Sequence, residues 1–145
     1  MIKIRDNRDI SIFKTILFLG NKKKDNIEKI KMNILHSHIK EACFYVSEMV
    51  CSGCYLELWE LFMNYYFTYI HTTNIKLTLY LNKRLEFFKE IINNYTGDLL
   101  NLRNIQQVRE LFIEMTVVLC GSCHENTIQM FKIEDRKSTR LNSSH

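Results

Sequence analysis

Two pairs of cysteines are the residues of this sequence whose type and spacing could support chemistry most directly. Cys51 and Cys54 form one CxxC pair, and Cys120 and Cys123 form the other. Four thiolates can hold a structural zinc ion, and two such pairs are a common source of them. However, residues 55–119 separate the pairs, a stretch far longer than in zinc fingers, and cysteine is also a common buried residue. The pattern favours free, mostly buried thiols and no cofactor, with a shared zinc site or a thioredoxin-like redox pair as alternatives.

A run of three lysines, Lys22, Lys23 and Lys24, lies in a segment, 1–31, in which basic residues outnumber acidic ones. Residues 32–135 carry an excess of acidic residues, although the whole chain has a formal net charge of +4. Such a run is most often a linker with its charges in water. An acidic body also argues against a dedicated nucleic-acid binder, which presents an extended positive face. The alternative interpretation is that the lysines neutralise the phosphates of a nucleic acid.

Arg103, Asn104 and Arg109 lie around the predicted start of a helix, where Asn104 caps the first turn and Gln107 is its capping-box partner. The arginines can form ion pairs with acidic residues further along the helix surface, which contributes only a few tenths of a kcal/mol per pair. The functional alternative is that Arg103, Asn104 and Arg109 contact a partner or a phosphate.

Other spacings that carry catalysis are missing from the sequence. It has no GxxxxGK[ST] loop to hold phosphates and no Gly-x-Ser-x-Gly elbow. No acidic residue is spaced to orient a histidine for nucleophilic catalysis. We therefore expect a protein that is not an enzyme.

The composition is that of one compact, ordinary domain. The chain has 145 residues, of which 46% are hydrophobic and 25% charged, and this excludes bulk disorder. No apolar run is long enough for a membrane span. Five cysteines without a convincing signal peptide indicate a reducing compartment, so we expect a cytoplasmic protein. The richness in Ile, Lys, Asn, Tyr and Phe, with no proline, is typical of AT-rich coding.

Hydrophobic spacing predicts helices over most of the chain. Apolar residues recur at spacings of three and four from 27 to the Ser52-Gly53 pair, over 55–71, over 76–95 and over 104–121. The 55–71 helix is expected to form the centre of the core. The side chains expected to point inward from it are Leu56, Trp59, Phe62, Met63, Tyr66, Phe67 and Ile70. An alternating start of 76–95 also fits a strand, but its remainder favours a helix. We predict an all-α fold, a compact bundle of about four principal helices with a short irregular or β-like N-terminal arm.

The predicted organisation is a basic N-terminal arm over 1–26, a helical domain over 27–125, a C-terminal extension over 126–135 and a tail over 136–145. The tail, RKSTRLNSSH, is polar and resembles a peptide that arises when adapter or vector DNA is translated. We expect it to be disordered and non-native, with the natural chain truncated near Asp135. The fold argument therefore uses only residues before 136.

Three segments carry a resemblance to known proteins: EMVCSGCYLELW at 48–59, YIHTTN at 69–74 and LNLRNIQQVRELFIEM at 100–115. They resemble an uncharacterised helical protein of nucleocytoplasmic large DNA viruses, the giant viruses. The order of an apolar helix, a Ser-Gly end and a Leu-Trp pair is also similar to the helical collar domains behind AAA+ clamp-loader ATPases. A collar implies subunit association without catalysis. Because this chain lacks the ATPase core, the resemblance transfers no functional residue.

Together these features predict a non-enzymatic helical scaffold or interaction protein of a large DNA virus, acting as a replication accessory through a collar-like helical domain. The expected partner is another protein or a missing C-terminal part of the same chain. The alternative is a small nucleic-acid-associated factor that uses the basic N-terminal segment. In either case we expect the host-cell cytoplasm and no membrane partner.

Overall fold

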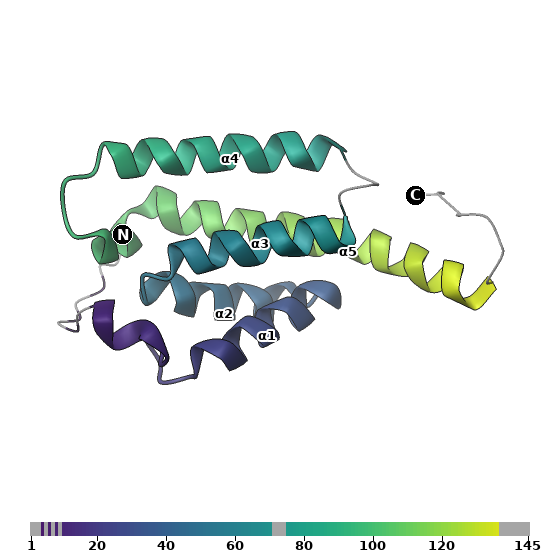
Figure 1. The fold of residues 1–145 in the computed structure, drawn as a ribbon, viewed down its shortest axis with the longest axis horizontal. Coiled ribbons are helices and arrows are strands. Elements are labelled where there is room, and N and C mark those ends of the chain that lie inside the picture. Colours follow the sequence, from purple (N-terminus) through teal and green to yellow (C-terminus); the bar gives the residue numbers. More distant parts are fainter. Residues whose placement is uncertain (1–3, 5, 7, 9, 71–74, 137–145) are drawn as a thin grey trace.

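The computed structural model describes residues 4, 6, 8, 10–70 and 75–136, and for 123–136 it describes only the helical backbone. Within these residues the chain forms α-helices and short 3-10 helices and no strand. In chain order they are η1 (Ile10–Lys14), α1 (Lys23–Leu35), α2 (Ile39–Cys51), α3 (Tyr55–Tyr69), α4 (Ile75–Asn93), η2 (Leu99–Asn104) and α5 (Gln106–Arg136). The all-α prediction is confirmed. The expected four principal helices are instead five α-helices (Figure 1).

The first predicted helix is a hairpin of two helices, α1 and α2. The chain reverses between them at Ser37, whose φ of 57° lies in the left-handed region. The Ser37 hydroxyl donates a hydrogen bond to the carbonyl of Cys120, at 2.8 Å, and so fixes the turn against α5. Near the open end of the hairpin, the buried Asn26 side chain donates to the carbonyl of Tyr45. The apolar spacing continues through the turn because both helices face the same core. The break between α1 and α2 could therefore not be predicted from the spacing.

Aromatic side chains of α3, α4 and α5 meet in the centre of the core. Trp59 of α3 is only 6% exposed, as the sequence predicted. Its ring lies 5.8 Å from that of Phe88 on α4 and 5.7 Å from that of Phe112 on α5. Rings of this size at such separations dominate the packing energy of a small core. They also hold α4 at a distance from the other helices.

The inward face of α3 differs from the predicted one. Leu56 and Phe67 were expected to point inward and are exposed, whereas Leu58, Leu61 and Tyr65 are buried. The error follows from a helix that is apolar around more than half of its circumference, because spacing alone then fails to identify the buried side.

The longest helix, α5, contacts all four other α-helices. In Figure 1 it runs behind α3, between α4 and the α1–α2 hairpin, and its last turns continue past the other helices. The predicted stop at Gly121 is wrong. Gly121 is exposed, and an added Cβ there would meet nothing within 4 Å. A glycine in a helix interior costs about 1 kcal/mol relative to alanine, which a long, packed helix tolerates.

The segment before α1 packs on the bundle without forming the β-like arm that the sequence suggested. Its regular structure, within the described residues, is η1 and one isolated bridge between Ile16 and Lys22. Phe13 and Leu17 from this segment are fully buried. A turn at Gly20, whose φ is 92°, reverses the chain and leads into α1 at Lys23, before the predicted helix start.

None of the helices in the described part of the chain is both long enough and apolar enough to cross a membrane.

Candidate functional site

The first cysteine pair lies where α2 ends and α3 begins. Cys51 is the last residue of α2, and Cys54 directly precedes α3. Cys54 is buried, and this burial raises the pKa of its thiol to about 11. Burial also raises the pKa of Cys51, although the charges of Arg109 and Arg103 oppose the change. A reactive or metal-binding cysteine needs the thiolate form, so these surroundings favour inert thiols over the redox pair.

The second cysteine pair is remote from the first. Cys120 lies further along α5, about 16 Å beyond Arg109 at the rise of an α-helix. The thiol whose charge affects the pKa of Cys120 is Cys43, whereas Cys51 is affected by the arginines near the start of α5. The side chain of Cys123 lies outside the described residues. Among the side chains that are described, no three of His, Cys, Asp or Glu gather into a metal site. The described side chains therefore bring no third metal ligand to Cys51 and Cys54.

The residues Arg103, Asn104 and Arg109 are brought together at the junction of η2 and α5. Arg103 is only 1% exposed, and its guanidinium donates to the carbonyl of Cys51 at 2.7 Å and to that of Asp6 at 3.3 Å. Arg109 donates from Nε to the carbonyl of Arg103 and from Nη2 to Oδ1 of Asn104. Among the described residues, neither arginine forms the ion pair with an acidic residue of the helix surface that the sequence suggested. Arg103 acts inside the fold, where it satisfies backbone carbonyls.

Asn104 is not the helix cap that the sequence predicted, because α5 begins at Gln106 and η2 ends at Asn104. Its side-chain amide instead binds the N-terminal segment. Oδ1 accepts a hydrogen bond from the backbone N–H of Ile4 at 2.6 Å, and Nδ2 donates to the Ile4 carbonyl at 3.4 Å. One side chain thus satisfies both backbone polar groups of Ile4.

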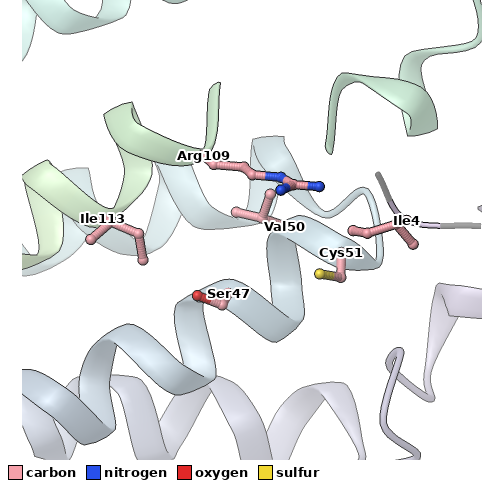
Figure 2. Close-up of a pocket in the computed structure, with 6 residues that line it drawn as sticks. All are labelled: Ile4, Ser47, Val50, Cys51, Arg109 and Ile113. Atoms are coloured by element: carbon pink, nitrogen blue, oxygen red, sulfur yellow. The ribbon is translucent and has the colours of Figure 1, made fainter. Parts of the chain in front are cut away.

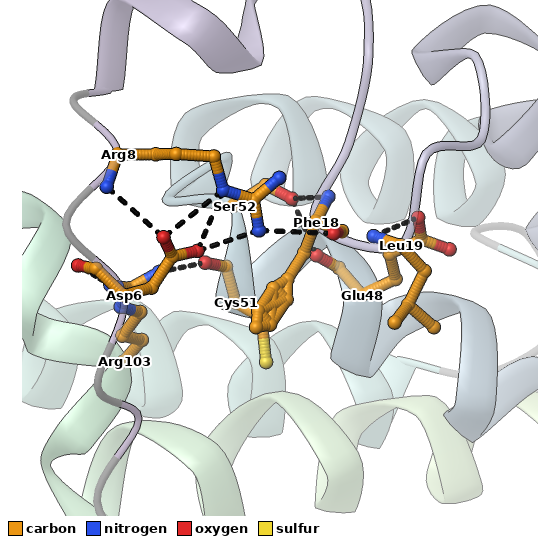
Figure 3. A network of polar contacts seen from close by, with 8 residues as sticks. All are labelled: Asp6, Arg8, Phe18, Leu19, Glu48, Cys51, Ser52 and Arg103. Atoms are coloured by element: carbon orange, nitrogen blue, oxygen red, sulfur yellow. Dashed lines mark hydrogen bonds and ion pairs between the residues drawn. The ribbon is translucent and has the colours of Figure 1, made fainter.

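A polar network extends this attachment to α2 (Figure 3). Asp6 forms an ion pair with Arg8 at 2.6 Å, and Arg8 also donates to the carbonyl of Phe18. The hydrogen bonds with Arg8 lower the pKa of Asp6 to about 2. Two further bonds reach the end of α2, from the N–H of Phe18 to the Ser52 hydroxyl and from that of Leu19 to the Glu48 carboxylate.

A cavity of about 330 Å³ lies between α2 and α5, beside this attachment (Figure 2). The residues that line it are Ile4, Ser47, Val50, Cys51, Arg109 and Ile113. Its walls are mainly aliphatic, and Arg109 reaches across Val50 towards Ile4 and Cys51. The size is at the lower end of the range for small-molecule sites. This cavity could not be predicted from the sequence, because its wall residues come from three segments that are far apart along the chain.

The three lysines lie at the start of α1 and not in a linker. Lys23 forms an ion pair with Glu57 at 2.9 Å and is mostly buried. Burial, which favours the neutral amine, is outweighed by its hydrogen bonds to Glu57 and Cys54, so the pKa of Lys23 is raised. Lys22 and Lys24 are exposed, and together with Lys14 they line a second cavity of about 450 Å³.

A comparison of the chain with known family models, curated proteins and solved structures finds no match to any of them.

Proposed function

We propose that this protein is a helical scaffold of a large DNA virus that binds other proteins without catalysis, as an accessory to replication. The observation that supports this function best is a group of exposed apolar side chains at one end of the bundle, where α3 finishes and α4 starts. Phe67 is 59% exposed, Ile75 is 76% exposed and Leu79 is 60% exposed. We call these three residues the α3–α4 patch.

The segments that carry the patch lie close together, because the Tyr66 hydroxyl at the end of α3 forms a hydrogen bond with Thr78 near the start of α4. Ile75 and Leu79 are four residues apart on α4 and therefore share one face of that helix. The last turns of α5 extend beyond the bundle at the same end (Figure 1). Grouped apolar side chains in water are typical of a surface that another protein covers.

The test is affinity purification of the tagged chain from cells infected with a large DNA virus. A triple variant, Phe67→Ser, Ile75→Ser and Leu79→Ser, removes the patch. A matched variant, Met32→Ser, Phe44→Ser and Leu56→Ser, removes three exposed apolar side chains from α1, α2 and the opposite end of α3. We expect a replication protein to copurify with the parent and with the matched variant but not with the patch variant. Retention of the same proteins by all three chains would contradict the proposal, as would the absence of any replication protein.

The second candidate is a nucleic-acid-associated factor, and the lysine-lined cavity supports it. Lys14, Lys22 and Lys24 converge there on the start of α1, where the helix dipole adds further positive potential. Phosphate neutralisation by lysines makes binding weaken steeply with salt.

Retention of the chain on immobilised DNA tests this second candidate. A triple variant, Lys14→Gln, Lys22→Gln and Lys24→Gln, should elute at lower salt than the parent. The control variant Lys40→Gln, Lys76→Gln and Lys89→Gln has the same net charge and changes exposed lysines elsewhere. Equal elution of the two variants would show that only the overall charge matters and would reject the lysine cavity as a site.

A further inference from the structure

The cavity between α2 and α5 combines an aliphatic wall with one charged group. Val50 and Ile113 contribute the wall from the two helices, and Ile4 covers one end of it (Figure 2). Arg109, from the first turn of α5, is the charged residue of the lining. A concave apolar surface with a single directed polar group is the usual form of a small-molecule site.

The charge of Arg109 lacks an acidic partner within the described residues. Its two hydrogen bonds go to a backbone carbonyl and to the Asn104 amide, both of which are neutral. A guanidinium has five N–H donors, so donors remain for a ligand. Arginine side chains pair with carboxylates when one is in reach, because two parallel N–H···O bonds then form.

The surroundings of Arg109 add positive charge. Arg103 lies next to it and donates to two backbone carbonyls, and its Nε is buried without a partner in the described structure. The first turn of α5 holds no acidic residue that would balance the helix dipole. The two carboxylates of this region already have partners: Glu48 accepts from the N–H of Leu19 and from the Asn21 side chain, and Asp6 pairs with Arg8, which lowers its pKa together with Arg103. The cavity is therefore apolar inside and electropositive on one side.

We propose that this cavity binds a small aliphatic carboxylate of the medium-chain fatty-acid type. The carboxylate pairs with Arg109, and the alkyl chain packs against Val50, Ile113 and Ile4. Ile4 is held beside the cavity by two hydrogen bonds to Asn104. The site is separate from the α3–α4 patch, because Cys51 precedes α3 and Phe67 lies near its far end.

The thiol of Cys51 lines the cavity and reports directly on an occupant. Cys43 is an internal control, because it lies on the same helix, is half-buried like Cys51 and is not part of the lining. The experiment measures the rates at which iodoacetamide alkylates the two thiols, by peptide mass spectrometry, with and without octanoate. We expect octanoate to slow the alkylation of Cys51 and to leave that of Cys43 unchanged. Octanol, which has the tail without the charge, should protect Cys51 about tenfold less well, as expected for one lost charge-assisted hydrogen bond.

Two variants separate the roles of charge and cavity. Arg109→Gln should weaken protection by octanoate about tenfold, whereas Arg84→Gln, which removes an arginine paired with Glu114 elsewhere, should leave it unchanged. Ser47→Leu fills the cavity from α2 and should abolish protection even if Arg109→Gln disturbs the fold. Equal alkylation of Cys51 with and without millimolar octanoate would overturn the proposal. Protection that is the same in the parent, Arg109→Gln and Ser47→Leu would also overturn it.

Discussion

The side-chain amide of Asn104 pairs with both backbone polar groups of Ile4, which is 100 residues earlier in the sequence. The same oxygen accepts a further hydrogen bond from Arg109. Asn104 thereby links the N-terminal segment to the start of α5. The attachment is made by a side chain to backbone, so it sets the position of the segment without requiring a particular residue at position 4.

Replacement of Asn104 tests this attachment. We expect Asn104→Ala to increase hydrogen exchange at the Ile4 amide about tenfold, since the amide loses its acceptor. Asn101→Ala, a change at an exposed asparagine of η2, serves as the control and should leave the exchange unchanged. NMR measures the exchange rate of the Ile4 amide. Equal rates in Asn104→Ala and Asn101→Ala would refute the attachment.

Acid should weaken the same region through Asp6. Its pKa is about 2 in the folded chain, below the ordinary 3.8, so the ion pair with Arg8 stabilises the fold fully above pH 3.8. The contribution decreases as the pH falls from 3.8 and is lost below 2, where the carboxylate is protonated in both the folded and the unfolded state. We expect Asp6→Asn to reduce the free energy of unfolding at neutral pH and to approach the parent as the pH falls through 2. Urea titrations across this range, with Glu60→Gln as a control, measure the difference in the free energy of unfolding between the parent and Asp6→Asn. A difference that stays constant with pH would show that the ion pair is unimportant.

Trp59 should be the most costly single truncation in the core. We expect Trp59→Ala to lower the free energy of unfolding by about 3–5 kcal/mol, because it leaves a cavity between Phe88 and Phe112. Trp59→Phe should cost less, about 1–2 kcal/mol, since the indole Nε1 has no hydrogen-bond partner to lose within the described residues. Urea unfolding followed by circular dichroism measures both. In the parent, tryptophan emission typical of water would contradict the burial.

The cysteines should hold no stoichiometric metal. Cys120 lies about 16 Å along α5 beyond Arg109, whose charge acts on the Cys51 thiol, and no three metal-ligating side chains gather within the described residues. Elemental analysis of the purified chain should find far less than one zinc per chain, and EDTA should leave the helical signal intact. One zinc per chain, with loss of helix on chelation, would be the contrary result.

Removal of residues 136–145 should leave the thermal midpoint unchanged. The segment has a single apolar residue, Leu141, and no helical periodicity. Differential scanning calorimetry of the shortened chain measures the effect directly. A clear drop in midpoint would show that the tail packs on the fold.

The sequence predicted which residues form the core better than it predicted where helices end. The stripe predicted from Ile27 to Met49 is mostly buried: Ile30, Ile34, Ala42, Val46 and Met49 are buried, whereas Ile27 is half-buried and His38 is exposed. The break within it was missed because a reversal through Ser37 carries neither glycine nor proline. The opposite error occurred at Gly121, where α5 continues through an exposed glycine because one glycine in a helix costs only about 1 kcal/mol relative to alanine.

The candidate site was predicted less well than the core, for a physical reason. Because arginine is charged, Arg103 was expected on the surface. Its guanidinium is instead buried, because it donates hydrogen bonds to the carbonyls of Cys51 and Asp6. Residues so far apart in sequence reveal such a contact only after folding. Asn104 and Arg109 were recognised as a group, whereas the role of Ile4 in the same cavity had no sequence signal.

The pairing of Ile4 with Asn104 also sets an order of events during synthesis. The α1–α2 hairpin joins neighbouring segments, so it can form as soon as both have left the ribosome. Ile4 has to wait until Asn104 has been made and η2 has folded. The attachment of Ile4 is therefore completed long after the α1–α2 hairpin can form.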